Sequence, residues 1–281
     1  MKILLLTNPN DPLGVIYEPS VMIKIIEWAR GRQLHTIVDE IFALSVHNVG
    51  DDLDQFQSII KILDNRLGVD VHFLYGLSKD FGATGFRFAM LYTQNEQLLQ
   101  TLANLNIFSG VPNPMQMIVS DMLIDDEFLD SFLEESRCRL LSSYNICVQK
   151  LNEMVVPFVH AKAGIFVYVD FSYLLPEQTF EGEAKFAALI EDVAKIVMTP
   201  GRSQRDCKPG MFRLCYSWVS PEVLEIAMER LSYVVLQIRR NNWDDLLTGS
   251  WRKEVTKCGT DLSTRRSTMN LSDLMRGNKI G

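Results

Sequence analysis

The sequence lacks the features that define several other classes of protein. No apolar run approaches the ~18 residues of a membrane-spanning helix, and the apolar opening Met1–Leu6 is too short for a signal peptide. The five cysteines are odd in number and include no C-x-x-C pair, which argues against a disulfide framework or a zinc site and favours a reducing cytosol. Neither G-x-G-x-x-G nor G-x-x-x-x-G-K-[ST] occurs, which argues against a generic nucleotide-binding domain. We therefore expect a cytoplasmic protein with no membrane association and no metal site.

Positive charge is scarce over most of the chain. The 281 residues carry a net charge of −7, and 47% of them are hydrophobic, which is typical of a globular protein of one large or two small domains. Residues 252–281 depart from this pattern, with seven basic and three acidic residues among many Ser and Thr. We interpret 241–281 as a disordered tail. A solvated extension is a simpler interpretation of this tail than a segment that contacts nucleic acid or lipid. The acidic body argues against nucleic-acid binding.

Short apolar runs alternate with helical patterns over the first hundred residues. A helix is predicted from Pro19, with one apolar face built from Val21, Ile25 and Trp28 together with Met22, Ile26 and Ala29. The spacing predicts parallel strands joined by right-handed crossovers, with ligands bound beyond their carboxyl ends. The predicted strands are Lys2–Thr7, His35–Val38, Val71–Tyr75 and Phe88–Tyr92.

The pattern changes after about residue 114. Helices then dominate, with a few strands between them, which is typical of a smaller α+β domain. We therefore expect a large domain over 1–125, a small domain over 126–240 and the tail beyond. The predicted helices are 115–123, 127–151, 183–195 and 221–236, and the predicted strands are 165–169 and 212–216.

Side chains that could carry chemistry follow three of the predicted strands, within residues 8–14, 39–42 and 78–87. Lys79 and Arg87 follow the strand that ends at Tyr75, and Asp39 ends the strand before it. A lysine amine can form a Schiff base with an aldehyde, an arginine with a nearby hydroxyl such as Ser78 can bind phosphate, and an acid can pair with a pyridinium nitrogen. Taken one at a time, each residue has a simpler role: Lys79 as a solvated loop lysine, Arg87 in a surface ion pair and Asp39 as a helix cap. Their placement at neighbouring strand ends favours a site for pyridoxal 5'-phosphate.

The order and spacing of five motifs resemble those of one enzyme family. The sequence resembles the fold-type-I pyridoxal-phosphate enzymes of aminotransferase class I/II, and within them it is most similar to 1-aminocyclopropane-1-carboxylate synthases. The resemblance implies an α/β fold, in which a mostly parallel sheet with helices on both faces precedes a smaller α+β domain. The motifs are Asn8-Pro9-Asn10-Asp11-Pro12-Leu13-Gly14, Val38-Asp39-Glu40-Ile41-Phe42, Ser78-Lys79-Asp80-Phe81-Gly82 with Gly85-Phe86-Arg87, Ala163–Asp170, and Pro209-Gly210-Met211-Phe212-Arg213.

The resemblance also implies roles for individual residues. Lys79 would form the Schiff base with the cofactor and move the substrate proton, and Asp39 would hold the protonated ring nitrogen. Ser78 and Arg87 would bind the cofactor phosphate, and Arg213 would bind the α-carboxylate of an amino-acid substrate. Members of the family are usually homodimers. Neither the substrate nor the choice between transamination and elimination follows from the motifs.

Several positions depart from the family pattern. Asp11 and Phe42 stand where the family usually has an Asn and a Tyr that donate hydrogen bonds to the cofactor's phenolic oxygen, and Gly76 replaces a usual phosphate-binding Ser. The family also has a long segment ahead of the first motif, so we expect an N-terminally truncated large domain. Two functions stay open on these grounds. The chain is a pyridoxal-phosphate enzyme, or it is an inactive remnant or a non-catalytic binding protein.

Overall fold

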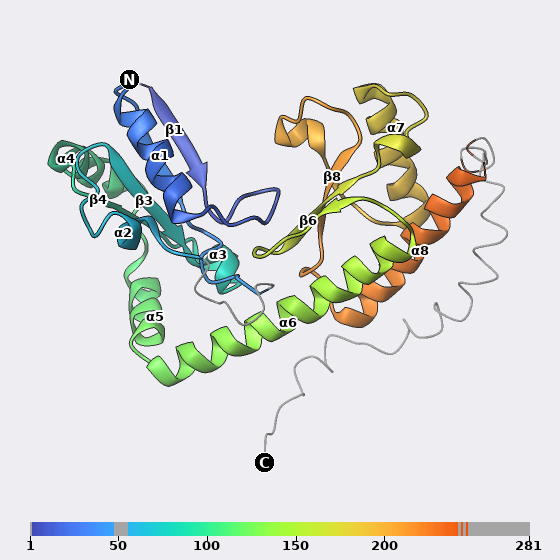
Figure 1. Cartoon of the computed structure of the whole chain (residues 1–281). Coiled ribbons are helices and arrows are strands. Elements are labelled where there is room, and N and C mark those ends of the chain that lie inside the picture. The colour runs from blue at the N-terminus through green and yellow to red at the C-terminus, as the bar shows by residue number, and fades with distance from the viewer. Residues whose placement is uncertain (1, 48–55, 241–242, 244–245, 247–281) are drawn as a thin grey trace, which may run out of the picture.

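The chain forms two lobes, each built on a four-stranded sheet (Figure 1). The computed structural model describes residues 2–47, 56–240, 243 and 246. Apart from Trp243 and Leu246, the predicted tail lies outside the described residues. The domain bounds predicted from the sequence stay a prediction, although the long helix α6 (Asp126–Glu153) begins where we placed the boundary.

The first sheet has the order β1 (Ile3–Thr7), β2 (His35–Asp39), β3 (Val71–Gly76) and β4 (Ala89–Thr93). The first three strands run parallel, and Thr7, Asp39 and Leu74 lie side by side in the register. The carboxyl ends of β1, β2 and β3 therefore meet at one edge, as the spacing predicts. β4 runs antiparallel to β3, because the chain between them folds as a short helix α3 (Leu77–Asp80) and a 3-10 turn instead of crossing the sheet. The predicted mixed, mostly parallel fold is confirmed.

Helix α1 (Pro19–Arg30) packs on this sheet together with the short α2 (Ile59–Ile62). Met22 and Ile26 are fully buried against Val38 and Val71, whereas Val21 and Trp28 are exposed. The predicted apolar face was therefore only half right. Two adjacent apolar stripes fit the same helical period, and only tertiary packing decides which one faces the sheet. Further along the chain are α4 (Glu96–Leu105) and α5 (Asn113–Leu123).

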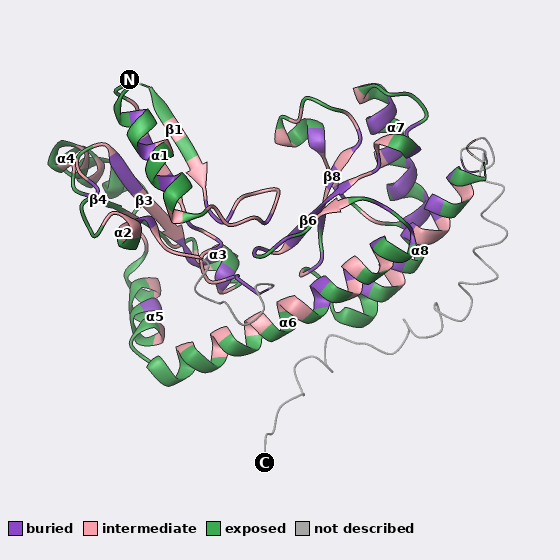
Figure 2. Cartoon of the chain, in the orientation of Figure 1, coloured by how far each residue is buried: buried purple, intermediate pink, exposed green. Residues whose placement is uncertain are grey.

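The second lobe is an antiparallel sheet packed against helices. Its strands follow the order β5 (Phe158–Val159), β6 (Phe166–Asp170), β8 (Met211–Cys215) and β7 (Thr199–Pro200). The carboxyl-terminal half of α6 packs on α8 (Pro221–Arg239) and buries one face, which includes Tyr144, Cys147 and Leu151, whereas its amino-terminal half is largely exposed (Figure 2). α7 (Phe180–Leu189) begins earlier than predicted, because the Thr179 hydroxyl accepts a hydrogen bond from Gly182 N and caps it. A π-helical turn, Ile190–Ala194, follows α7.

Two segments of the first lobe are bonded directly to the second. The carbonyl of Gly14 accepts hydrogen bonds from the backbone N–H groups of Lys162 (2.8 Å) and Ala163 (3.0 Å). Gly14 has φ +65°, and a Cβ there would lie 2.5 Å from the Ala161 methyl, so this approach requires glycine. The imidazole Nε2 of His47 lies 2.6 Å from the Tyr216 hydroxyl. Both segments follow strands of the first sheet, so the candidate site lies where the lobes meet.

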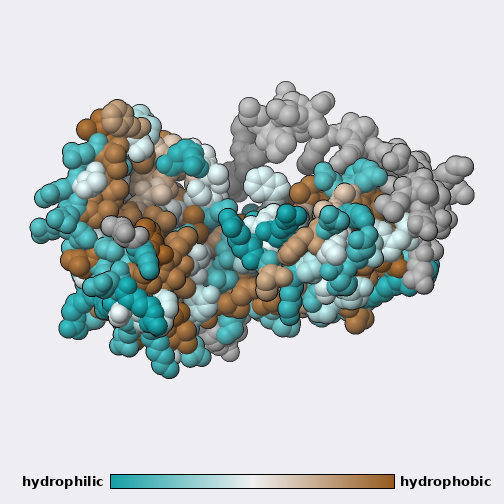
Figure 3. All heavy atoms as spheres, turned by 90° about the horizontal axis from the view of Figure 1, so that it is seen from above, coloured by the Kyte–Doolittle hydropathy of each residue, from teal (hydrophilic) through white to brown (hydrophobic). Residues whose placement is uncertain are grey.

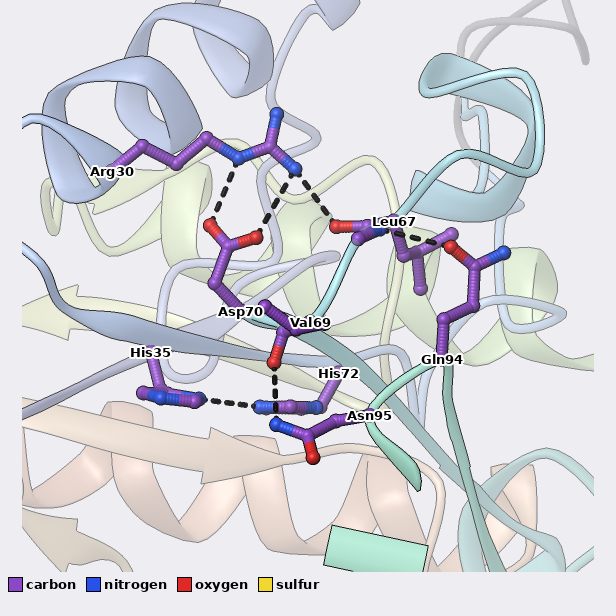
Figure 4. Close-up of polar contacts among 9 residues, drawn as sticks. Arg30, His35, Leu67, Val69, Asp70, His72, Gln94 and Asn95 are labelled. Carbon is purple, nitrogen blue, oxygen red and sulfur yellow. Dashed lines mark hydrogen bonds and ion pairs between the residues drawn. The ribbon is translucent and has the colours of Figure 1, made fainter. Parts of the chain in front are cut away.

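A polar cluster occupies the opposite edge of the first sheet, where β2 and β3 begin (Figure 4). The stacked rings of His35 and His72 bring two ring nitrogens within 2.9 Å, and His72 Nδ1 lies 2.7 Å from the Thr93 hydroxyl. Nearby, Arg30 Nε and Asp70 form an ion pair of 2.8 Å. The two histidine rings thus stack against each other within the sheet.

Two features are absent from the described part of the chain. No helix there is long and apolar enough to cross a membrane. No group of three or more His, Cys, Asp or Glu residues is placed there to hold a metal ion. The four described cysteines, Cys138, Cys147, Cys207 and Cys215, are free thiols.

Candidate functional site

Asp39 is the last residue of β2 and stands at the common carboxyl edge of the parallel strands. Its carbonyl accepts a hydrogen bond from Asn8 N (3.0 Å), and its side-chain Oδ1 accepts one from Ile41 N (3.2 Å). Burial raises the pKa of Asp39, the Ile41 N–H lowers it, and the negative charge of Asp11 raises it. Asp11 therefore lies close enough for its charge to act on Asp39.

Lys79 and Ser78 lie in α3, directly after β3. The side chain of Lys79 is exposed and that of Ser78 is half-buried. The Ser78 carbonyl accepts a hydrogen bond from the Thr84 hydroxyl (3.1 Å), and Arg87 Nη1 donates to the Thr84 carbonyl (3.1 Å). Arg87 is exposed and has a left-handed backbone, with φ +52°. Thr84 thus links the turn that carries Ser78 to the turn that carries Arg87.

Asp80 joins the lysine segment to the segment that follows Asp39, a contact that the sequence analysis missed. Its carboxylate is buried and accepts hydrogen bonds from Leu44 N (2.9 Å), the Ser45 hydroxyl and the Tyr75 hydroxyl (3.1 Å). Burial raises the pKa of Asp80 and these donors lower it, which together leave the pKa at about 6. The only sequence signal was an acid directly after Lys79. Asp80 fixes where α3 sits relative to the end of β2.

Arg213 and Asp11, which sequence reasoning gave to separate partners, are brought together. Nη1 of Arg213 lies 2.7 Å from Asp11 Oδ1 and 2.8 Å from Asp11 Oδ2. The Arg213 guanidinium lies over the Phe166 ring at 5.0 Å from its centroid, and the buried Phe42 meets that ring edge-on at 5.3 Å. The side chains of Arg213 and Asp11 keep 27% and 29% of their surface exposed. This arrangement joins β8 of the second lobe to the loop after β1.

Asn8 contributes a buried polar atom beside Asp39. Its Oδ1 accepts a hydrogen bond from Tyr17 N (3.0 Å), whereas its Nδ2 has no hydrogen-bond partner among the described residues. A buried amide donor without a partner is uncommon in proteins. An unused donor and a half-buried acid therefore lie at the same strand edge.

The predicted site residues fall into two groups. Asp11, Asp39, Phe42 and Arg213 lie around Phe166 and the loop after β1, whereas Lys79, Ser78 and Arg87 lie on the turns after β3. In the part of the chain that is described, no hydrogen bond or ion pair joins Lys79 to a member of the first group. A cavity of about 740 Å³ between α6 and residues 217–221 contains none of these residues.

Solved structures of aminotransferases share this fold. An aromatic aminotransferase from Pyrococcus horikoshii matches with a TM-score of 0.74 at 21% identity, covering 85% of this chain and 60% of that one. A double mutant of the Thermus thermophilus aspartate aminotransferase matches with a TM-score of 0.71 at 22% identity, covering 83% and 57%. The fold is thus that of a partial fold-type-I large domain followed by a smaller domain.

The chain belongs to the aminotransferase class I and II family, whose model matches residues 1–231. It is 32% identical over 242 residues to a 1-aminocyclopropane-1-carboxylate synthase of Glycine max, covering 84% of this chain and 49% of that enzyme. It is 29% identical over 258 residues to 1-aminocyclopropane-1-carboxylate synthase 6 of Arabidopsis thaliana, covering 92% and 52%. The chain spans about half the length of these curated relatives. The cofactor expected from the sequence, pyridoxal 5'-phosphate, is the cofactor of this family.

Proposed function

We propose that the chain binds pyridoxal 5'-phosphate and acts with it on the amino group of a small substrate, as an aminotransferase or as a 1-aminocyclopropane-1-carboxylate-synthase-like enzyme. The main support is the juxtaposition of Asp39 with the lysine turn. Asp39 and Lys79 follow neighbouring parallel strands, and Asp80 bonds the two segments together. An amine and an acid held in this way suit an aldehyde and a cationic ring nitrogen.

The residues present fit the cofactor at several points. Lys79 is the residue for its covalent attachment, and Asp39 is the partner of its ring nitrogen. A cationic nitrogen beside Asp39 would oppose the effect of burial and keep this carboxylate ionised. Ser78 and Arg87 are the proposed phosphate ligands, and the unused Nδ2 of Asn8 is a donor available to the ring side. When bound, the cofactor supplies an electron-accepting ring that stabilises negative charge on a substrate carbon.

A second candidate is a non-catalytic, ligand-binding member of the family. The observation that favours it is the ion pair between Asp11 and Arg213, which engages the predicted substrate-binding arginine. Phe42 favours it too, because its side chain has no hydrogen-bond donor for the cofactor's oxygen. The two candidates differ in turnover of an amino compound and not in cofactor attachment.

Cofactor attachment is tested by borohydride reduction of the full chain with added pyridoxal 5'-phosphate, followed by peptide mass mapping. We expect the label on Lys79 and expect its loss in Lys79→Arg. Lys24→Arg is the matched control, since Lys24 is an exposed lysine on α1. Label on other lysines only, or no label, would contradict the proposal. Asp39→Asn should weaken cofactor binding at least tenfold, because the ring nitrogen then loses its anionic partner.

A homodimer and a cytoplasmic location complete the proposal. Support for a dimer comes from large apolar side chains that are left exposed on the first lobe after α4, where Phe108 is 91% and Ile107 is 78% exposed. Sedimentation velocity on the full chain tests the dimer, and a monomer at micromolar concentration would contradict it.

A further inference from the structure

The geometry points to Asp11 as a specificity residue that weakens the binding of carboxylates to Arg213, so that the site prefers an amine whose reacting carbon carries no carboxylate. This inference rests on the proposed function for the existence of a substrate. Within that proposal it favours the aminotransferase, because the product that names the synthases carries a carboxylate on its amino-bearing carbon. The weaker binding of carboxylates to Arg213 rests on the contacts of the ion pair.

The ion pair has the geometry of an engaged site. A single guanidinium nitrogen, Nη1 of Arg213, contacts both carboxylate oxygens of Asp11, at 2.7 and 2.8 Å. Among the described residues, no other hydrogen bond is made by either side chain. The Phe166 ring covers one face of the guanidinium at 5.0 Å. Nη2 and Nε of Arg213 form the edge left for a carboxylate ligand, which would then lie beside Asp11.

Charge makes that approach unfavourable. Asp11 already neutralises Arg213, so a second carboxylate on the same guanidinium would gain less attraction and would lie close to a like charge. The charge of Asp11 also reaches Asp39, which brings a second acid to the same side of the site. An uncharged substituent on the reacting carbon is repelled by neither Asp11 nor Asp39. An asparagine at position 11, which is usual in the family, would remove the negative charge and leave Arg213 with an unpaired positive charge.

The loop holds Asp11 in this place. Gly14, three residues on, is bonded to Lys162 and Ala163, and the buried Asn8 accepts from Tyr17 N at the other end of the loop. A carboxylate ligand must therefore bind beside Asp11 or displace it against a loop that is fixed on both sides.

The first arm of the test needs no cofactor. Propionate, with propionamide as its uncharged counterpart, is titrated into the full chain and followed by NMR. We expect Asp11→Asn to bind propionate at least about tenfold more tightly than the unaltered chain, with less than a twofold change for propionamide. Adding Arg213→Gln to Asp11→Asn should abolish the gain. Asp70→Asn is the matched control, because it breaks the partly exposed Arg30–Asp70 ion pair at the far edge of the sheet and should leave propionate binding unchanged.

The second arm compares n-propylamine with 2-aminobutyrate, its α-carboxylated counterpart, by the absorbance of the chain loaded with pyridoxal 5'-phosphate. The unaltered chain should prefer the amine, and Asp11→Asn should shift the ratio at least tenfold toward the amino acid. Equal propionate affinity in the unaltered chain and Asp11→Asn, or no shift in the ratio, would overturn the inference. Failure of the proposed function is seen separately, as absence of label on Lys79, and leaves the propionate arm intact.

Discussion

The two lobes differ in how much apolar side chain they bury. Within the described residues, the second lobe has a core cluster of 27 buried residues, whereas the cluster between α1 and the first sheet has six. Hydrophobic side chains also lie on the surface of the first lobe (Figure 3). Ile3 and Leu5 of the edge strand β1 are 57% and 62% exposed. Apolar burial is the main stabilising contribution to a fold. The lobe that carries Lys79 and Asp39 therefore has the smaller share of that stabilisation.

The largest expected effect is on the second core. Phe212 is fully buried among Phe171 and Phe186, so Phe212→Ala should lower the free energy of unfolding by about 3–5 kcal/mol. Ile26→Ala, in the first core, should cost about 2–3 kcal/mol, because its neighbours can relax toward solvent. Urea denaturation followed by circular dichroism measures both. A larger loss in Ile26→Ala would contradict the comparison of the lobes.

Glu40 should make the first lobe less stable as the pH rises. It is buried and accepts a hydrogen bond from Ile59 N (2.6 Å), and burial raises its pKa from 4.5 to about 7. Between these pH values the folded chain holds a proton that the unfolded chain has lost, so stability falls with rising pH by about 3 kcal/mol. Glu40→Gln keeps an acceptor for Ile59 N and should remove most of this slope. Urea midpoints from pH 4.5 to 7.5 test it, and parallel slopes in the two proteins would contradict it.

His47, at the junction of the lobes, should act in the opposite direction. Burial lowers its pKa from 6.5 to about 4. Between pH 6.5 and 4, His47 is protonated in the unfolded chain but stays neutral in the folded chain. The free energy of unfolding therefore falls by about 3 kcal/mol as the pH falls over this range. His47→Gln retains a polar partner for Tyr216, and in this variant the loss of stability at acid pH should be smaller. Urea midpoints from pH 4 to 7 measure this loss. An unchanged acid limb of the stability profile would show that His47 is not buried as a neutral ring.

The smallest expected effect concerns helix caps in the two lobes. Thr179→Ala removes the cap of α7 and should cost about 1 kcal/mol. Asn95→Ala should cost more, because Asn95 accepts from Leu98 N (3.0 Å) to cap α4 and also donates to the Val69 carbonyl (2.9 Å). Thermal melts of the two variants give the comparison. Equal melting temperatures would mean that the bond to Val69 adds nothing.

Local sequence patterns predicted most of the strands and turns that position the candidate site. The strands ending at Thr7, Asp39 and Gly76 are short apolar runs followed by turn residues, and parallel pairing brings such ends to one edge. The face that α1 buries was only half predicted, because two of its apolar stripes fit the same period.

Contacts between distant segments could not be predicted. Asp11 and Arg213 are 202 residues apart, and no local pattern says that an acid after β1 meets a cation on β8. Asp80 could have been suspected, because an acid beside Lys79 needs a reason, but its bonds to Leu44 and Ser45 depend on tertiary packing.

The close approach of Gly14 to the second lobe couples ligand binding to the relative motion of the lobes. The loop that carries Asp11 is attached to residues 161–163 by two hydrogen bonds and to β8 by the Asp11–Arg213 ion pair. A ligand of the proposed site that displaced Asp11 would remove one of these attachments, and it would favour arrangements in which the lobes are less tightly joined. By thermodynamic reciprocity, any interaction that separates the lobes raises the affinity of Arg213 for that ligand by the same factor.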